Sequence, residues 1–168
     1  DNAGRVYVAD TFNNAIRMLQ PTNQVVMVGA IVDAASESIR PISPGKIAIL
    51  YGAGLGPSQL KQFQTTNNGV IDTQLAGTSV RFNGVSAPVL YSSATQVAVI
   101  APYGVSGGTA SAIVTYQGQI SAAFRVPLAA ASPAIFTLNQ TGAGQAAAVN
   151  PDGTTNTAAN PVKIGGTI

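Results

Sequence analysis

Short runs rich in valine, isoleucine, tyrosine and phenylalanine recur along the chain, and glycine, proline and asparagine separate them. This pattern predicts an all-β antiparallel sandwich, because helices need longer segments in which apolar residues recur every three to four positions. Residues 34–38 alone could form a helical turn. We expect strands at residues 5–9, 15–19, 24–32, 46–51, 77–83, 86–91, 95–101, 109–117, 119–127, 134–138 and 145–150.

Three turns join neighbouring strands. Asn83-Gly84 stands between two apolar runs, and both residues tolerate the positive φ of the type I′ turn that suits a two-stranded ribbon. Gln117-Gly118 predicts a second hairpin, and residues 150–153 (NPDG) fit a type I turn closed by glycine. All three turns favour antiparallel pairing.

Charged residues make up only 8% of the 168 residues, while 46% are apolar. Serine, threonine, asparagine, glutamine and glycine must therefore cover the surface, which leaves little charge repulsion between copies. The net charge is +2, and the basic residues are scattered rather than clustered as phosphate binding requires. No apolar run approaches the ~20 residues of a membrane span. The composition favours a surface or structural protein that binds no nucleic acid and does not span a membrane.

The chain contains neither histidine nor cysteine, which removes the commonest general base, the thiolate nucleophile and the usual metal ligands. The remaining acid–base candidates are carboxylates, of which Asp33 and Glu37 could share one face of a helical turn. Two carboxylates on such a turn are more typical of a solvated capping pair than of a glycosidase site. We therefore predict no catalytic, cofactor or metal site, and a protein that is not an enzyme.

Two motifs invite an enzymatic interpretation that the local sequence does not support. Residues 52–56 (GAGLG) follow an apolar strand as in dinucleotide-binding proteins, but no amphipathic helix follows to hold a pyrophosphate. Ser43 and Lys46 satisfy the S-x-x-K pattern of a serine nucleophile and its base, yet Pro44-Gly45 prevents the helical turn that this chemistry needs. A glycine-rich loop and a turn that enters a strand are the predicted structures.

Two stretches resemble known families. The run from Gly4 to Thr11, followed by residues 13–17, looks like an NHL repeat, a blade motif of β-propellers. From Val32 onward the chain resembles the Solibacter-type C-terminal domain, an uncharacterised bacterial module often placed after NHL propellers and related to the Ig-like IPT/TIG folds. The segments that carry this second resemblance are residues 42–45 (ISPG), 51–57 (YGAGLGP), 75–77 (LAG), 87–91 (APVLY), 95–97 (TQV) and 132–136 (SPAIF).

The second resemblance implies a secreted or cell-surface Ig-like β-sandwich of unknown activity. A propeller function does not carry over, because only about half of one blade is present. We expect residues 1–20 to form an extended NHL-like β-segment and residues 21–138 to form the Ig-like sandwich. Residues 139–168 should be a C-terminal extension that starts a second, incomplete β unit, since residues 160–168 loosely repeat residues 43–49.

Both ends of the chain look like β-strands that lack partners, and an unpaired strand offers its backbone donors and acceptors to another chain. We therefore expect copies of the protein to join head to tail by strand addition into an extracellular or cell-surface filament. The partner in this interpretation is the protein itself. The predicted strand donors are Val6, Tyr7, Val8, Ile16, Met18 and Leu19.

Two alternatives stay open. A carbohydrate-binding or adhesion module would bind a polysaccharide through exposed aromatic rings, for which the candidates are Tyr51, Tyr91, Tyr103 and Tyr116. These tyrosines sit mostly in or beside apolar runs, which favours packing over ligand binding. Alternatively, the chain is a piece of a longer propeller protein, and its partner is the remainder of that protein.

Overall fold

The computed structural model describes residues 6–11, 15–19, 25–65 and 68–168 of the chain. These residues contain thirteen β-strands and no helix. The strands are β1 (Val6–Asp10), β2 (Ala15–Leu19), β3 (Met27–Asp33), β4 (Ile47–Ala53), β5 (Lys61–Gln62), β6 (Gln74–Leu75), β7 (Thr78–Phe82), β8 (Val85–Ala87), β9 (Val89–Ser92), β10 (Gln96–Ile100), β11 (Thr109–Tyr116), β12 (Gln119–Ile120) and β13 (Phe124–Pro127).

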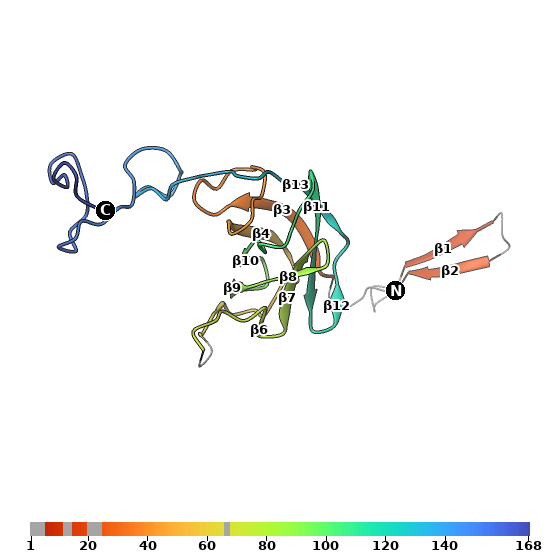
Figure 1. The fold of residues 1–168 in the computed structure, drawn as a ribbon. Helices are drawn as coiled ribbons and strands as arrows, with labels where there is room; N and C mark the ends of the chain where they lie inside the picture. Colours follow the sequence, from red (N-terminus) through yellow and green to blue (C-terminus); the bar gives the residue numbers. More distant parts are fainter. Residues whose placement is uncertain (1–5, 12–14, 20–24, 66–67) are drawn as a thin grey trace.

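Two sheets face each other and form a β-sandwich (Figure 1). One sheet has the strand order β3-β4-β10-β9-β5, and the other has the order β12-β11-β7-β6, with β13 also paired to β11 and β8 to β7. The paired strands run antiparallel in both sheets. The predicted all-β, Ig-like antiparallel sandwich is therefore confirmed.

The core lies between the inner faces of these two sheets, because successive residues of a strand point to opposite faces. In β11 every second residue from Ala110 to Tyr116 is buried, and the paired strand β7 contributes Val80 and Phe82. From the other sheet, Leu50 and Val97 lie side by side in the β4–β10 pair and are fully buried. A smaller cluster covers the outer face of the five-stranded sheet and consists of Val32, Ile49 and Ala98, with Ala34, Tyr51, Leu90 and Tyr91 packed against it.

The turns follow the predicted chemistry. Asn83 and Gly84 have φ angles of 49° and 83° between β7 and β8, and Gln117 and Gly118 have φ angles of 46° and 81° between β11 and β12. Two successive residues with positive φ are what a type I′ hairpin requires. The turn at residues 150–153 is closed by a hydrogen bond from the Gly153 N–H to the Asn150 carbonyl at 2.9 Å.

The glycine-rich loop is structural, as predicted. A Cβ atom on Gly52 would lie 1.9 Å from the Met27 carbonyl oxygen, and one on Gly56 would lie 2.0 Å from the Ser92 Oγ. Glycine is required at both positions because no side chain fits beside these atoms. The glycines thus lie directly against the start of β3 and the end of β9, and within the described residues no helix follows the loop.

Four predicted strands are not formed as expected. The strand predicted at residues 86–91 is divided at Pro88 into β8 and β9, which belong to different sheets. Residues 119–127 are two short strands, because at residues 121–123 the Ser121 hydroxyl accepts a hydrogen bond from the Val114 N–H at 3.0 Å and interrupts the ladder. Residues 134–138 and 145–150 form no strand, and a single bridge joins Thr137 to Ala146. These segments follow β13, the last strand of the sandwich, and neither of them pairs with a strand of either sheet. A strand without a sheet neighbour is not stable.

The two chain ends differ from each other. Strands β1 and β2 pair with each other, from Val6 opposite Leu19 to Asp10 opposite Ala15, and form a separate two-stranded sheet that Figure 1 shows apart from the sandwich. The N-terminal strands therefore have one another as partners, contrary to the prediction that they lack one. Residues 163–168 form no strand and make a turn at residues 164–165, so the strand predicted there is wrong.

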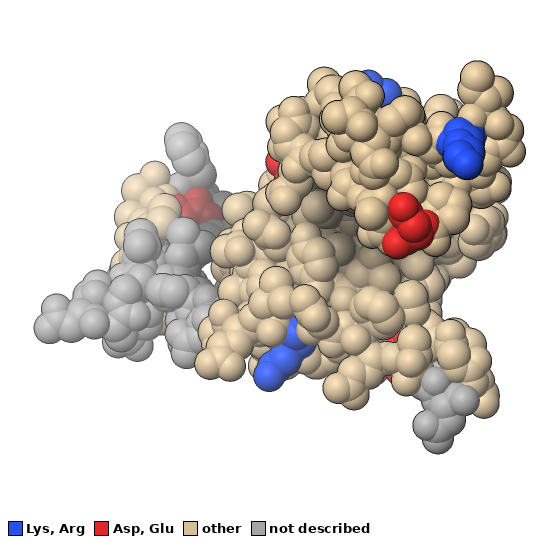
Figure 2. Space-filling model, turned by 90° about the vertical axis from the view of Figure 1, so that its left-hand side faces the viewer, with Lys and Arg blue, Asp and Glu red and all other residues tan. Residues whose placement is uncertain are grey.

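The surface carries few charges. Figure 2 shows one face of the molecule, on which single lysine, arginine and acidic side chains are separated by broad uncharged areas. This agrees with the small charged fraction of the sequence, 8%. Surfaces of this kind set up little repulsion between copies.

Candidate functional site

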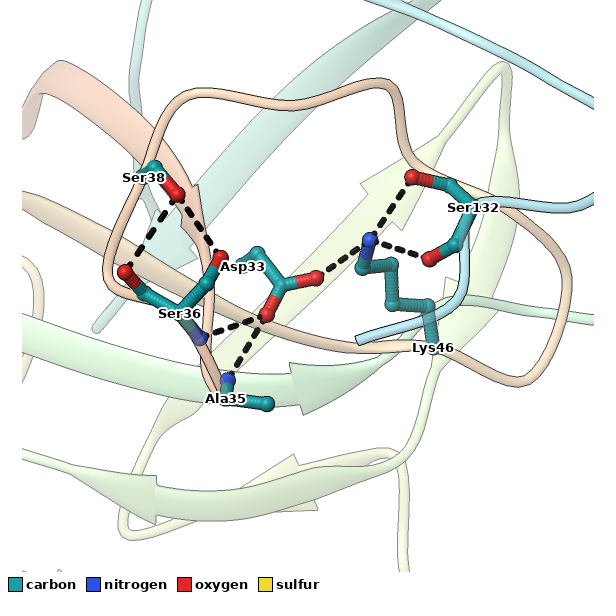
Figure 3. Close-up of polar contacts among 6 residues, drawn as sticks. All are labelled: Asp33, Ala35, Ser36, Ser38, Lys46 and Ser132. Atoms are coloured by element: carbon teal, nitrogen blue, oxygen red, sulfur yellow. Dashed lines mark hydrogen bonds and ion pairs between the residues drawn. The ribbon is translucent and has the colours of Figure 1, made fainter. Parts of the chain in front are cut away.

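A buried ion pair joins the end of β3 to the start of β4 (Figure 3). Asp33 is the last residue of β3, and Lys46 directly precedes β4, which runs back antiparallel to it. The Lys46 ammonium contacts the Asp33 carboxylate, and only 8% of the lysine side chain and 1% of the aspartate side chain are exposed. Buried charges of this kind are stable only when they are paired and hydrogen-bonded.

The second carboxylate oxygen of Asp33 caps the turn that follows β3. It accepts hydrogen bonds from the N–H groups of Ala35 at 2.8 Å and Ser36 at 2.9 Å. Burial by itself would raise the pKa of Asp33, but the hydrogen bonds from Lys46, Ser36 and Ala35, together with the lysine charge, hold this pKa below its usual value. The carboxylate is therefore ionised in the folded protein at neutral pH.

Ser132 completes the cluster from a distant part of the sequence. The Lys46 Nζ donates one hydrogen bond to the Ser132 carbonyl oxygen at 2.6 Å and another to the Ser132 Oγ at 2.9 Å. The cluster lines a cavity of about 470 Å³, whose walls also include Ser43, Pro44 and Phe136. In this arrangement Lys46 is a hydrogen-bond donor that joins Asp33 to Ser132.

Ser43 and Lys46 belong to a turn closed by a hydrogen bond from the Lys46 N–H to the Ser43 carbonyl at 3.1 Å, as predicted for a chain entering a strand. Asp33 does cap residues 34–36, but it is buried rather than solvated, whereas Glu37 is exposed. Within the described ranges, no three acidic side chains lie close enough together to hold a metal ion.

The predicted strand donors lie on the β1–β2 hairpin. Tyr7 faces Met18 across the hairpin and Ala9 faces Ile16, so these four side chains share one face. Their large members are exposed, by 53% for Tyr7, 77% for Ile16 and 49% for Met18. Val8 lies on the opposite face and is 44% exposed, while the side chains of Val6 and Leu19 lie outside the described part of the structure.

A groove opens between the two sheets at their edges. Strand β3 ends one sheet, and strands β12 and β13 lie at the edge of the other. The groove has a volume of about 340 Å³, and three of its lining side chains are large and exposed: Val25, Met27 and Ile120. We call this feature the edge groove; it is lined by residues 25–28, 119–120 and 122–124.

The four candidate tyrosines do not form one site. Tyr116 is 6% exposed and belongs to the core, which is the packing role that its apolar neighbours in the sequence favoured over ligand binding. Tyr51 and Tyr91 are half-buried in the small outer cluster. Burial, followed by the neighbouring Tyr51 and Glu37, raises the pKa of Tyr91. Tyr103 is 83% exposed.

Two of these features, the ion pair and the edge groove, were missed from the sequence. The antiparallel β3–β4 pairing brings Asp33 and Lys46 together. The sequence signal for this ion pair was an acidic residue at the end of one strand and a basic residue at the start of the next. The groove depends on which strands end each sheet. That order follows from the tertiary structure and leaves no local signal.

The strand order, together with the absence of a helix among the residues that the structure describes, defines the sandwich as an Ig-like β-module. A family model for the IPT/TIG domain matches residues 30–126, which is more than half of the chain. The chain therefore belongs to the IPT/TIG family. Domains of this family are generally non-catalytic modules that mediate protein interactions.

A comparison with curated proteins found no match. In the part of the chain that the structure describes, no helix is long and apolar enough to cross a membrane.

Proposed function

We propose that the protein is a non-enzymatic extracellular structural module whose copies join by strand addition. The β1–β2 hairpin of one copy is the donor, and the edge groove of the next copy is the acceptor. The observation that carries this proposal is the apolar face of the hairpin, on which Tyr7, Ile16 and Met18 are exposed. An isolated two-stranded hairpin is at best marginally stable in water, so a partner that covers this face stabilises it.

The edge groove suits such a donor in two respects. Strand β3 forms one of its edges, and strands β12 and β13 form the other. The backbone N–H and C=O groups of an edge strand can form hydrogen bonds with an added strand. Its exposed side chains Val25, Met27 and Ile120 are apolar like those of the hairpin face. Membership of a family that mediates protein interactions supports the same conclusion.

Donor and acceptor are different surfaces of one chain, so the contact is head to tail. A head-to-tail contact that does not close into a ring produces a filament. The extracellular location rests on the resemblance to a secreted or cell-surface module. The weak charge of the surface supports close association of copies.

Negative-stain microscopy tests this proposal. We expect filaments from the unchanged chain and dispersed particles from the double variant Ile16→Lys/Met18→Lys, because two ammonium groups on the hairpin face cannot be buried. The control Ile39→Lys changes a residue that is 78% exposed outside the hairpin and the groove, and it should leave filaments intact. Dispersed particles from the unchanged chain, or filaments from the double variant, would contradict the proposal.

The competing interpretation is that the hairpin pairs with the remainder of a larger propeller protein. The resemblance of residues 4–17 to an NHL repeat supports a hairpin that completes a blade rather than a neighbour's sandwich. The intact mass of the native material distinguishes the two. A mass much larger than the 16.9 kDa of this chain supports the propeller, and a mass near it supports self-assembly.

Carbohydrate binding is a second candidate, and Tyr103 is the residue that favours it. Its ring is exposed and lies against Gly45, where an added Cβ would be only 2.8 Å from the tyrosine hydroxyl oxygen. An exposed ring held against backbone suits stacking on a sugar. If this function is correct, the chain is retained on a polysaccharide column and Tyr103→Ala abolishes the retention, while Tyr116→Phe does not.

A further inference from the structure

The chain crosses one end of the sandwich after β13. We call residues 129–142 the strap. At its start, the Ala129 N–H donates to the Ile42 carbonyl at 3.0 Å, and Ser132 then reaches the Lys46 ammonium. Figure 3 shows Ser132 approaching the cluster from a different segment than Asp33 and Lys46. The strap also walls the cavity of about 470 Å³ through residues 130–134 and 136.

The strap contacts the sandwich again at its far end. Gly142 has a φ of +71°, and a Cβ atom there would lie 2.5 Å from the Cα of Ser36. Its N–H donates to the Thr137 Oγ1 at 3.0 Å, which fixes the bend of the strap. Ser36 is itself held by the Asp33 carboxylate. The Ser132 and Gly142 contacts of the strap therefore both depend on Asp33, one through Lys46 and the other through the turn after β3, whereas the Ala129–Ile42 bond does not.

Lys46 depends on the strap in return. An ammonium group has three N–H donors, and a buried one is costly unless all of them find acceptors. Asp33 provides one acceptor, and the two oxygens of Ser132 provide the others. If the strap lifts away, Lys46 loses two of its three acceptors. The closed strap is thus the arrangement in which the buried charge is satisfied.

We propose that Lys46 is a positioning residue that clasps the strap onto the sandwich and thereby fixes the direction in which residues 143–168 leave it. This inference does not rest on self-assembly. In Figure 1 the C-terminal extension runs outward from the strap. A fixed exit direction sets the orientation of whatever follows the sandwich in the chain.

The experiment compares the unchanged chain with the double variant Asp33→Asn/Lys46→Met. Both charges are removed together, so no unpaired charge is buried, and the amide oxygen can still accept from Ala35 and Ser36. The chain contains no cysteine, so Arg81→Cys and Ala158→Cys place two spin labels without further changes. Arg81 is exposed on β7, and residue 158 is exposed in the extension.

We expect one narrow distance distribution between the labels in the unchanged chain and a broad one in the double variant. Cleavage by elastase within the alanine-rich residues 129–134 should become at least about tenfold faster as the strap opens. Lys61→Met removes an exposed lysine on β5 and should change neither readout.

Ser132→Ala keeps the backbone acceptor and removes the hydroxyl, so it should give an intermediate cleavage rate even if the double variant fails to fold. A narrow distribution together with cleavage rates within about twofold of the unchanged chain, in both variants, would overturn the proposal.

Discussion

The sandwich and the C-terminal extension are ordered by different interactions. Between its sheets the sandwich buries a continuous cluster of apolar side chains, among them Phe82, Leu50 and Val114. In the extension, by contrast, Val149 is 55% exposed and Ile164 is fully exposed. Apolar burial stabilises the sandwich by about 25 cal/mol for each Å² removed from water, and the extension lacks this contribution.

Polar side chains hold the extension together instead. Asn150 is buried, and its Nδ2 donates to the Asn160 carbonyl at 3.1 Å, while its Oδ1 accepts from the Asn156 Nδ2 at 2.8 Å. Asn160 also donates to the Thr154 Oγ1 at 2.8 Å. We call these residues the Asn–Thr network. A hydrogen bond adds only about 1 kcal/mol net in water, so the extension should open locally while the sandwich stays folded.

The largest effect should come from the core. Phe82→Ala removes a fully buried ring between the sheets and should lower the free energy of unfolding by about 4 kcal/mol. Urea denaturation followed by circular dichroism measures this loss. The matched control Phe63→Ala changes a ring that is 40% exposed and should cost much less. Equal losses at both positions would mean that the inner faces are not the main source of stability.

The next largest effect should come from the ion pair. Lys46→Met leaves the Asp33 carboxylate buried without its partner and should lower the free energy of unfolding by about 3 kcal/mol. Adding Asp33→Asn should recover most of this loss, because the unpaired charge is then removed. If the double variant were as unstable as Lys46→Met alone, the loss would come from packing of the lysine stem and not from the charge.

A smaller and local effect is expected in the extension. Asn150→Ala removes three side-chain hydrogen bonds and should lower local stability by about 1–2 kcal/mol. Hydrogen exchange should speed up at the Asn156 N–H, which donates to the Ala148 carbonyl, and stay unchanged in β11. Faster exchange in β11 as well would show that the two regions unfold together, and would contradict local opening of the extension.

Lowering the pH should produce the smallest loss of stability, and this loss should arise in the sandwich. The pKa of Asp33 is lower in the folded chain than its ordinary value of 3.8. Its contribution to stability is therefore fully present above about pH 4 and is lost as the pH falls through the folded pKa. Thermal unfolding from pH 6 down to pH 2 should show a loss that Asp33→Asn reduces. An equal loss in that variant would assign it to other carboxylates.

The same contrast explains how much of the structure could be predicted from sequence. The hairpin turns at Asn83-Gly84 and Gln117-Gly118 were predicted correctly because two residues set their geometry locally. Predicted strands at 134–138 and 145–150 failed because a strand also needs a neighbouring sheet edge, which the sequence does not display. In the same way, β5 and β6 were missed because a strand of two residues carries no periodic pattern and forms only through its partners.

The residues of the candidate sites could be predicted from sequence to different degrees. The hairpin donors Tyr7, Ile16 and Met18 were named because the N-terminal segments look like strands, and the structure exposes them on one face. Ser132 reaches Lys46 across 86 positions of sequence, a contact that no local pattern indicates. Tyr103 and Tyr116 both follow apolar runs, so the sequence could not tell which of the two rings is exposed. The structure shows that Tyr116 is buried by the register of β11, whereas Tyr103 is exposed.

Chemical cross-linking between copies tests the central claim of hairpin-to-groove assembly most directly. Met18→Cys on one tagged copy and Ile120→Cys on a differently tagged copy place single thiols on the hairpin and in the edge groove of an otherwise cysteine-free chain. With a short bismaleimide linker we predict a product that contains both tags, and its loss when Ile16→Lys is added to the first copy. The absence of a mixed product, or its persistence with Ile16→Lys, would contradict this assembly.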